Sequence, residues 1–234
     1  MSTVRRILLS IFLLSLLPGI LPAQQGQPAA ETMMMPEEFS NTLKQIWSFL
    51  KSETETHLAS VATRGEFETS QEFQRRVTDA RQQYVAKTLK YGQDQNLGER
   101  VFPVLFKAVL ESYDADRQLF SISSKTVVEA PYNIPTIECR IRSNPYVFLA
   151  DSIRAGYRTS SLYISLPKGH RWQVARDMAR AAKADEPNVS FRVKFTVGIA
   201  HPDTRDRVVI ELDPRELALV NNATQQVFWA VPLK

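Results

Sequence analysis

The chain has few residues of the types that build crosslinked or nucleotide-binding proteins. Of its 234 residues only Cys139 is a cysteine, and eight are glycines. A single thiol excludes an internal disulfide, so side-chain packing must stabilise the fold. The sequence has neither a glycine-rich phosphate-binding loop nor a Gly-x-Ser-x-Gly nucleophile elbow. These absences argue against the nucleotide-binding and serine-hydrolase classes that local motifs reveal.

Histidine is scarce as well. His57, His170 and His201 are the three histidines, and none belongs to a His-Glu-x-x-His or Cys-x-x-Cys ligand pattern. We therefore predict no catalytic residue, no metal ligand and no cofactor, and a structural or surface role for each histidine. A hydrolase whose site joins His170 or His201 to a carboxylate distant in sequence stays open as an alternative.

A strongly apolar segment occurs only at the N-terminus. Residues 7–17 are almost entirely apolar, follow Arg5 and Arg6, and precede Pro18 and the small residue Ala23. The segment is shorter than the 20 or so residues that span a bilayer. This pattern predicts a signal peptide over residues 1–23, cleaved on export. We expect a periplasmic or secreted protein with no transmembrane span in the mature chain.

Charge is nearly balanced overall but unevenly distributed. The formal net charge is +4, and removal of Arg5 and Arg6 with the leader lowers it to +2, which disfavours nucleic acid as a partner. Residues 31–72 are acidic and residues 139–183 are basic. The two segments either compensate each other or the basic one binds anionic lipid or polysaccharide. The candidate anion-binding residues are Arg140, Arg142, Arg154, Arg158, Arg171, Arg176, Arg180 and Lys183.

Helical periodicity governs the first third of the mature chain. Residues 24–35 are polar and of low complexity, which predicts a disordered linker. An apolar stripe after Pro36 predicts a helix to about Val61. Thr69 to Glu72 fits a capping box that starts a second helix, and Gly92 is a natural stop. Residues 36–92 should therefore form an antiparallel pair of helices.

Residues 93–234 have the alternation and turn residues of a strand-rich domain. We expect short strands between Pro131, Pro135 and Pro145, and two separate strands at 208–212 and 217–220. A further helix is expected near 170–185, with Trp172 near its start and Ala175, Met178 and Ala182 on its apolar side. The predicted class is α+β, with two N-terminal helices, a mainly antiparallel sheet and one later helix.

Cys139 lies in a segment where apolar and charged residues alternate, as in a half-buried strand. It shares a face with Ile137 and Ile141. We expect a buried, inert thiol there.

The most distinctive string is Gly65-Glu66-Phe67-Glu68-Thr69, which continues to Glu72, Phe73 and Arg76. It predicts a structural corner in which Glu72 caps the helix, Phe67 and Phe73 pack where the helices join, and Arg76 pairs with Glu72. A polar binding site at this corner is the alternative.

The string resembles a Gly-Glu-Phe-Glu-Thr-x-x-Glu-aromatic-x-x-Arg string in uncharacterised exported or envelope-associated bacterial proteins. Residues 113–116 with Phe120 also resemble those proteins. The resemblance implies a bacterial origin and a periplasmic or outer-surface location. It implies no activity, because those proteins are uncharacterised.

Taken together, these features favour an exported, non-catalytic envelope protein that binds or assembles another envelope protein. Binding of anionic lipid or polysaccharide through residues 139–183 is the alternative, and the hydrolase is the second alternative.

Overall fold

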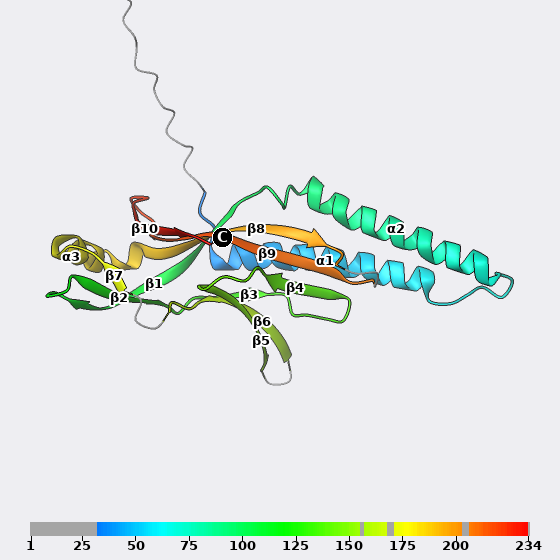
Figure 1. Cartoon of the computed structure of the whole chain (residues 1–234), viewed down its shortest axis with the longest axis horizontal. Coiled ribbons are helices and arrows are strands. Elements are labelled where there is room, and N and C mark those ends of the chain that lie inside the picture. The colour runs from blue at the N-terminus through cyan, green and yellow to red at the C-terminus, as the bar shows by residue number, and fades with distance from the viewer. Residues whose placement is uncertain (1–31, 155–156, 168–170, 203–205, 234) are drawn as a thin grey trace, which may run out of the picture. The chain divides into compact units, whose positions relative to one another are not determined.

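The computed structural model describes residues 32–154, 157–167, 171–202 and 206–233. The predicted signal peptide, most of the predicted linker and His170 lie outside the described residues. Residues 32–234 belong to one compact unit, whose elements are labelled in Figure 1. Two helices precede a mainly antiparallel sheet that is interrupted by one further helix, so the predicted α+β class is confirmed.

The first helix, α1 (Pro36–Val61), has the predicted bounds, and α2 (Ser70–Asp94) begins where the capping box predicts. The end of α2 differs from the prediction, since the helix passes Gly92. Asn96 adopts a positive φ of 50°, which ends a helix at low cost when the residue is asparagine. Gly92 lies inside the helix and faces β8, where a Cβ would make an ordinary van der Waals contact with Ile199 at 3.5 Å.

Seven strands form the larger sheet, in the order β10-β9-β8-β1-β2-β7, with β4 pairing in parallel with β9. Their bounds are β1 Phe102–Asp114, β2 Leu119–Ser124, β4 Ile137–Ile141, β7 Arg171–Gln173, β8 Val189–Ala200, β9 Val208–Asn221 and β10 Val227–Pro232. The other pairings in this sheet are antiparallel.

A smaller antiparallel sheet has the order β3-β6-β5. Its strands are β3 Val127–Ala130, β5 Val147–Arg154 and β6 Tyr157–Ile164. Pro131, Pro135 and Pro145 fall in the connections around these strands and β4, as the sequence predicts.

The predicted break between residues 212 and 217 is wrong, because β9 runs through it as one strand. Pro214 cannot donate a ladder hydrogen bond. The pairing with β8 accommodates it by a register shift, in which Lys194 pairs with Glu216 and Phe195 with Pro214. The extra residue, Arg215, makes a bulge, so the proline bends the strand without ending it.

The third helix, α3 (Arg176–Ala184), is shorter than predicted and is followed by a 3-10 turn over Glu186–Asn188. Trp172 belongs to β7 and is buried. Met178 is 45 % exposed, which corrects its predicted apolar-side position, and Ala179 is buried in its place. Small alanines let α3 pack closely, and they leave the larger Met178 on the outer side.

Backbone pairing is present slightly before the predicted helix. The amide of Met34 donates to the Pro103 carbonyl at 2.9 Å, and the Met34 carbonyl accepts from Leu105 at 3.0 Å. Residues 32–35, predicted as linker, therefore include a backbone pairing with β1. Met33 packs against a small apolar cluster on the sheet formed by Leu105, Ala218 and Val220.

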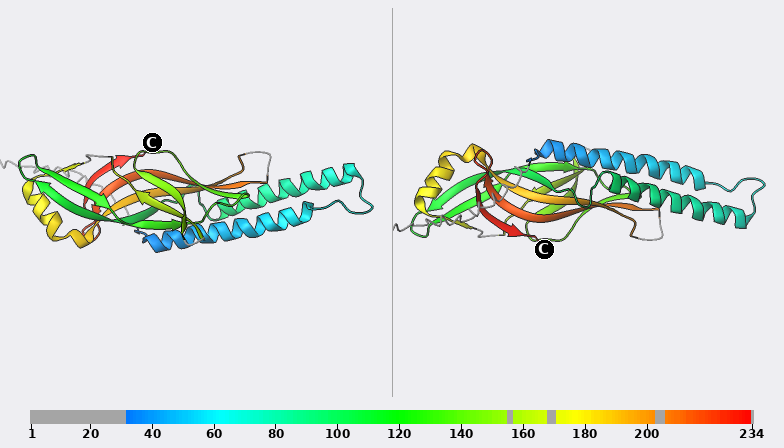
Figure 2. Two further views of the ribbon diagram at one scale, coloured as in Figure 1. Left: turned by 90° about the horizontal axis from the view of Figure 1, so that it is seen from below. Right: turned by 90° about the horizontal axis from the view of Figure 1, so that it is seen from above.

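The helical pair shares the hydrophobic core of the sheet. Phe39 of α1 lies 5.7 Å from the ring centre of Phe102 and 5.1 Å from that of Phe195, and all three are fully buried. Both views of Figure 2 show the helices side by side, with their joined end extending past the strands. The helices are thus anchored at one end by the sheet and supported mainly by each other at the other.

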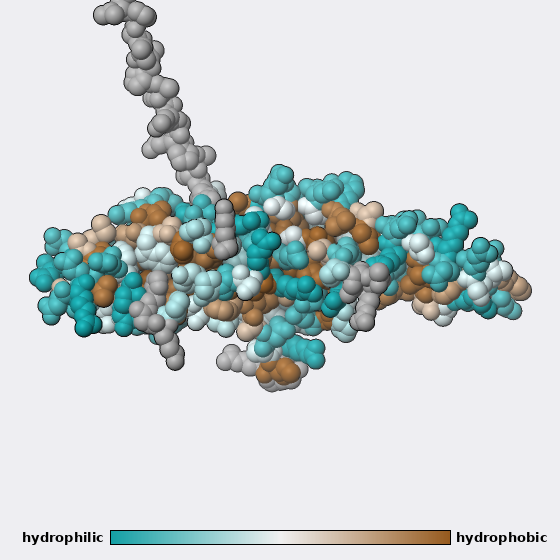
Figure 3. Space-filling model, viewed as in Figure 1, coloured by the Kyte–Doolittle hydropathy of each residue, from teal (hydrophilic) through white to brown (hydrophobic). Residues whose placement is uncertain are grey.

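The face drawn in Figure 3 intersperses hydrophobic residues (brown) with hydrophilic ones (teal) over helices and strands. Cys139 is buried beside Ile137, as predicted, and Ile141 is half-buried.

Candidate functional site

The chain reverses between α1 and α2 in a turn that its own side chains close. The amide of Glu68 donates to the Gly65 carbonyl at 3.1 Å, and the Gly65 amide donates to Oε2 of Glu68 at 3.0 Å. The short segment 65–68 is therefore fixed by two hydrogen bonds between the same two residues.

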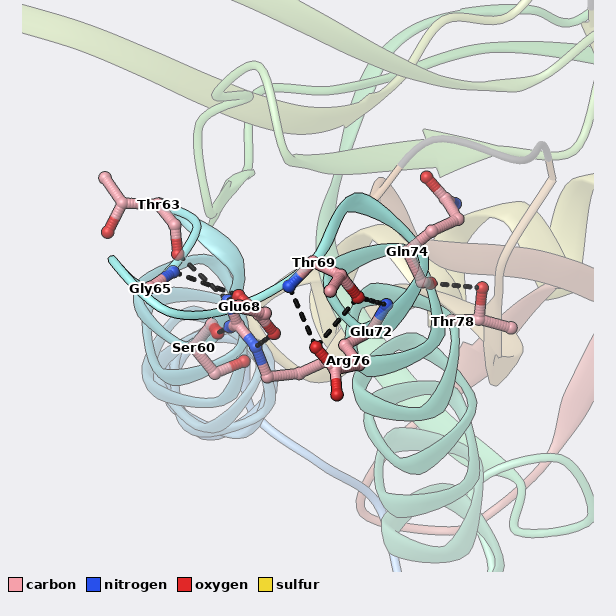
Figure 4. A network of polar contacts seen from close by, with 9 residues as sticks. All are labelled: Ser60, Thr63, Gly65, Glu68, Thr69, Glu72, Gln74, Arg76 and Thr78. Carbon is pink, nitrogen blue, oxygen red and sulfur yellow. Dashed lines mark hydrogen bonds and ion pairs between the residues drawn. The ribbon is translucent and has the colours of Figure 1, made fainter.

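The start of α2 is held by the predicted capping box, drawn in Figure 4. Thr69 Oγ1 accepts from the Glu72 amide at 3.2 Å, and Glu72 Oε2 accepts from the Thr69 amide at 2.8 Å. The Thr69 amide, and after it the Thr69 hydroxyl, lower the pKa of Glu72 below its ordinary value. Glu72 thus remains ionised and caps the start of α2.

Arg76 joins three pieces of chain at this corner. Its Nε and Nη2 each lie 2.9 Å from an oxygen of Glu68, and Nη2 also donates to the Thr63 carbonyl at 2.9 Å. Nη1 donates to the Ser60 carbonyl at the end of α1. The Arg76 hydrogen bonds, followed by the Gly65 amide, lower the pKa of Glu68 to about 2.

The predicted pairing of Arg76 with Glu72 is wrong, because the Glu72 carboxylate already accepts hydrogen bonds from the amide and the hydroxyl of Thr69. The fork of donors on a guanidinium matches the two oxygens of one carboxylate, and Glu68 presents both of them.

Phe67 is the residue that this network leaves outside. Its side chain is 92 % exposed, so the prediction that it packs where the helices join is wrong. Glu68 and Arg76 occupy the inner side of the turn. The Arg76 guanidinium also lies 5.1 Å from the ring centre of Phe73. Polar contacts therefore fill the space that the sequence assigns to Phe67.

Most charged groups around Phe67 have partners nearby. Glu66 is exposed and has no hydrogen bond or ion pair within the part of the chain that the structure describes. Arg64 donates to the Ser70 hydroxyl at 2.9 Å, and Arg75 lies 3.8 Å from Asp79. The helix-joining turn, residues 62–69, thus offers an aromatic ring beside one unpaired carboxylate on a rigid frame.

A second polar group lies between the helices and the segment that precedes β9. His57 Nε2 is 2.9 Å from Asp206 Oδ1, and its ring stacks on Tyr84 at 4.8 Å. The Tyr84 hydroxyl lies 2.8 Å from that of Thr54. Arg81 Nε approaches the same Asp206 oxygen at 3.7 Å.

His201 completes this group from the other side. Its Nε2 lies 2.7 Å from the Thr88 hydroxyl, and its ring meets Tyr84 edge-on at 5.3 Å. Burial lowers the pKa of His201 below its ordinary value, although the Arg207 carbonyl acts in the opposite direction. A neutral imidazole is the form that this environment favours.

The His57–Asp206 pair resembles half of a catalytic arrangement, but among the residues that the structure describes no nucleophile meets it. A hollow of about 220 Å³ beside His57 is lined by Ser60, Glu53 and Lys87 among others. Ser60 Oγ donates to the His57 backbone carbonyl at 2.7 Å, so it is directed away from the imidazole. The geometry supports a structural clamp between helices and sheet. His57 and Asp206 are 149 positions apart, and nothing local in the sequence signals the pair.

The predicted anion-binding residues are distributed over several elements. Arg140 and Arg142 belong to β4 or follow it directly, Arg158 is exposed on β6, and Arg171 is exposed on β7. Arg154 ends β5, and its side chain is outside the described part of the structure. The remaining three lie exposed on α3, namely Arg176, Arg180 and Lys183.

Some of these basic residues have structural partners. Arg140 and Arg142 approach Glu138 and Asp213 at 2.7 and 2.9 Å. Lys183 pairs with Glu186 at 2.7 Å and donates to the Leu110 carbonyl. The basic segment is therefore partly compensated by nearby carboxylates.

Within the described ranges, no cluster of three His, Cys, Asp or Glu residues could hold a metal ion. No helix in those ranges is long and apolar enough to cross a membrane. Comparison of the chain with protein-family models, with curated proteins and with solved structures finds no match.

Proposed function

We propose that the protein is an exported, non-catalytic envelope protein that binds another protein through the helix-joining turn, with Phe67 as the anchor. The observation that carries this proposal is the 92 % exposure of Phe67 on a turn whose backbone is fixed by Glu68 and Arg76. Export is supported by the pattern of residues 1–23 and by the resemblance to exported bacterial proteins.

Pre-organisation is the physical reason for choosing this turn. Binding costs free energy when a loop must become ordered, and a turn that is already fixed avoids much of that cost. Aromatic residues dominate the binding energy of protein interfaces when they enter a desolvated pocket. A single exposed aromatic on a mobile loop would contribute less to binding, because the loop would lose conformational entropy when it becomes ordered.

The charges near the turn indicate the chemistry of the partner. Around the turn, Arg64, Arg75 and Arg76 stand against four carboxylates, a net charge of −1, so the turn has little net attraction for an anionic lipid surface. The carboxylates are Glu66, Glu68, Glu72 and Asp79. Of the three glutamates of this corner, Glu66 is the one whose carboxylate has no partner in the described part of the chain. We therefore expect an apolar pocket on the partner, with a basic side chain beside it that pairs with Glu66.

Site-specific photocrosslinking tests the proposal in the cell. The full chain is expressed in a bacterial host with a photoreactive phenylalanine at position 67, and in parallel at the exposed control position Met178 on α3. We expect a discrete protein adduct from position 67 that is absent from position 178. Identical adducts at both positions, or none at 67, would overturn the proposal.

A further inference from the structure

A hollow of about 350 Å³ opens on the larger sheet, where β9 pairs with β4 on one side and with β8 on the other. We call it the arginine hollow, because arginines form most of its charged lining. Its volume is within the range of about 300–1,000 Å³ that is typical of small-molecule sites. The charged residues of the lining are Arg140, Arg142, Arg215, Glu211 and Asp213.

Strand pairing places these side chains on the face of the sheet opposite to α2. Glu211 pairs with Arg140 of β4 and with Gly198 of β8, so the three positions share one face. Ile199, the next residue of β8, belongs to the other face, where it lies beside Gly92 of α2. Gly198 has no side chain, so the space beside Glu211 in this row stays unfilled and becomes part of the hollow.

Two guanidiniums meet at one carboxylate and form a positive pole of the hollow. Arg142 Nη1 and Arg215 Nη2 lie 2.9 and 2.8 Å from the same oxygen of Asp213. Their side chains are nevertheless 66 % and 49 % exposed. Each guanidinium has five N–H donors, so most donors of the pair are left for an added carboxylate. Two arginines against one aspartate leave this pole with a net charge of +1.

Glu211 is the negative pole. Its side chain is exposed, and within the described part of the chain it has no hydrogen bond or ion pair. Its neighbour across the strands, Arg140, is directed instead to Glu138 at 2.7 Å. Glu211 lies two residues before Asp213 on β9, so the two carboxylates project from one face with their Cα atoms about 7 Å apart. The hollow therefore presents an uncompensated negative charge within a few ångströms of an uncompensated positive one.

We propose that the arginine hollow binds a small zwitterion that carries one carboxylate and one ammonium group, the chemistry shared by free amino acids and short peptides. The carboxylate contacts Arg142 and Arg215, and the ammonium contacts Glu211. Such a ligand neutralises both poles, whereas a simple anion leaves Glu211 unpaired and is repelled by it. The proposal goes beyond binding through Phe67 and does not depend on it. Arg140 and Arg142 are the two predicted anion-binding residues that line the hollow.

Isothermal titration of the purified protein at low salt tests the ligand class. The probes are alanine and alanyl-alanine, which carry both charged groups and little else. Each is matched by its N-acetyl form, which lacks the ammonium, and by its C-terminal amide, which lacks the carboxylate. We expect saturable binding of at least one zwitterion at one site per chain, and binding of its two blocked forms that is about tenfold weaker or more.

The stronger of the two zwitterions distinguishes a single amino acid from a short peptide as the ligand. Absence of saturable binding for both zwitterions would overturn the proposal. An N-acetyl form that binds as tightly as its parent zwitterion would overturn it as well, because the hollow would then be a plain anion site.

Variants locate the site. Glu211→Gln removes the negative pole, and Arg142→Gln combined with Arg215→Gln removes the positive one. We expect each change to weaken binding of the zwitterion about tenfold or more, and Glu211→Gln to abolish the preference over the N-acetyl form. Arg176→Gln on α3 is the matched control and should leave binding unchanged.

Thermal melting shows whether each variant is folded. Glu211 is exposed and has no partner among the described residues, so its replacement tests the site even if the double arginine variant does not fold. Equal weakening by Arg176→Gln, or a Glu211→Gln variant that binds the zwitterion as tightly as wild type, would contradict the assignment.

Discussion

Arg76 binds Glu68 through two hydrogen bonds of 2.9 Å, across the turn that separates α1 from α2. The same guanidinium contacts the carbonyls of Ser60, in the last turn of α1, and of Thr63, just after the helix. One side chain therefore determines both the shape of the turn and its position relative to the preceding helix. Because Glu68 turns inward to meet it, the adjacent Phe67 is left exposed.

Replacing Glu68 by Gln should loosen this turn without unfolding the protein. The variant loses the charge that Arg76 pairs with, so we expect faster amide hydrogen exchange over residues 60–72 and unchanged exchange in β8. Glu66→Gln is the matched control, since Glu66 has no partner among the described residues. Equal exchange in both variants would show that the ion pair does not order the turn.

The same pair makes a pH prediction. Hydrogen bonding lowers the pKa of Glu68 to about 2, below the unfolded carboxyl value of about 4.3. Its contribution to order is therefore complete above the unfolded pKa and is lost as pH falls toward the folded one. Hydrogen exchange in the turn, relative to β8, should rise between about pH 4 and pH 2 and should be flat from pH 5 to 8 in the wild-type chain.

His201 predicts a second, separate pH effect. Burial lowers its pKa, so the unfolded chain takes up a proton at a higher pH than the folded chain. Stability from this residue is complete above about pH 6.5 and decreases as pH falls below it. We expect the melting temperature of wild type to fall more than that of His201→Gln between pH 7 and pH 5. Parallel pH profiles would count against a buried neutral imidazole.

The packing of Phe39 predicts that the helices and the sheet unfold together. Truncating this fully buried ring should lower the free energy of unfolding by about 3–5 kcal/mol in Phe39→Ala. Phe67→Ala should change it by no more than about 0.5 kcal/mol, because that ring is exposed. Denaturant titrations followed by far-ultraviolet circular dichroism and by tryptophan fluorescence should coincide. A separate helical transition would contradict the shared core.

Cys139 should be unreactive in the folded protein. Its burial raises the pKa of the thiol to about 12, and its side chain is inaccessible. We expect maleimide to label it only in denaturant, with a rate that follows unfolding. Rapid stoichiometric labelling of the native chain would show that β4 opens locally.

The sequence predicted the elements that depend on local chemistry. Thr69 and Glu72 begin α2 through a capping box that is visible in four residues, and Pro36 begins α1. The alternation of apolar and charged residues around Cys139 correctly predicted which face of β4 is buried. Such signals act within one turn or one strand, so they can be read without knowing the fold.

Features that depend on tertiary contacts were not predictable in this way. Gly92 looks like a helix stop, yet α2 continues past it to Asp94, and Gly92 packs beside Ile199. Glu68 and Glu72 are both in reach of Arg76, and the choice between them depends on the Thr69 hydrogen bonds. The outward position of Phe67 follows from that choice.

Affinity for the partner identified by crosslinking tests the central claim most directly. The account predicts that Phe67→Ala weakens binding of the purified partner by about thirtyfold or more, as expected for an aromatic anchor, and that Met178→Ala leaves it unchanged. Dissociation constants that agree within twofold for wild type and Phe67→Ala would contradict it.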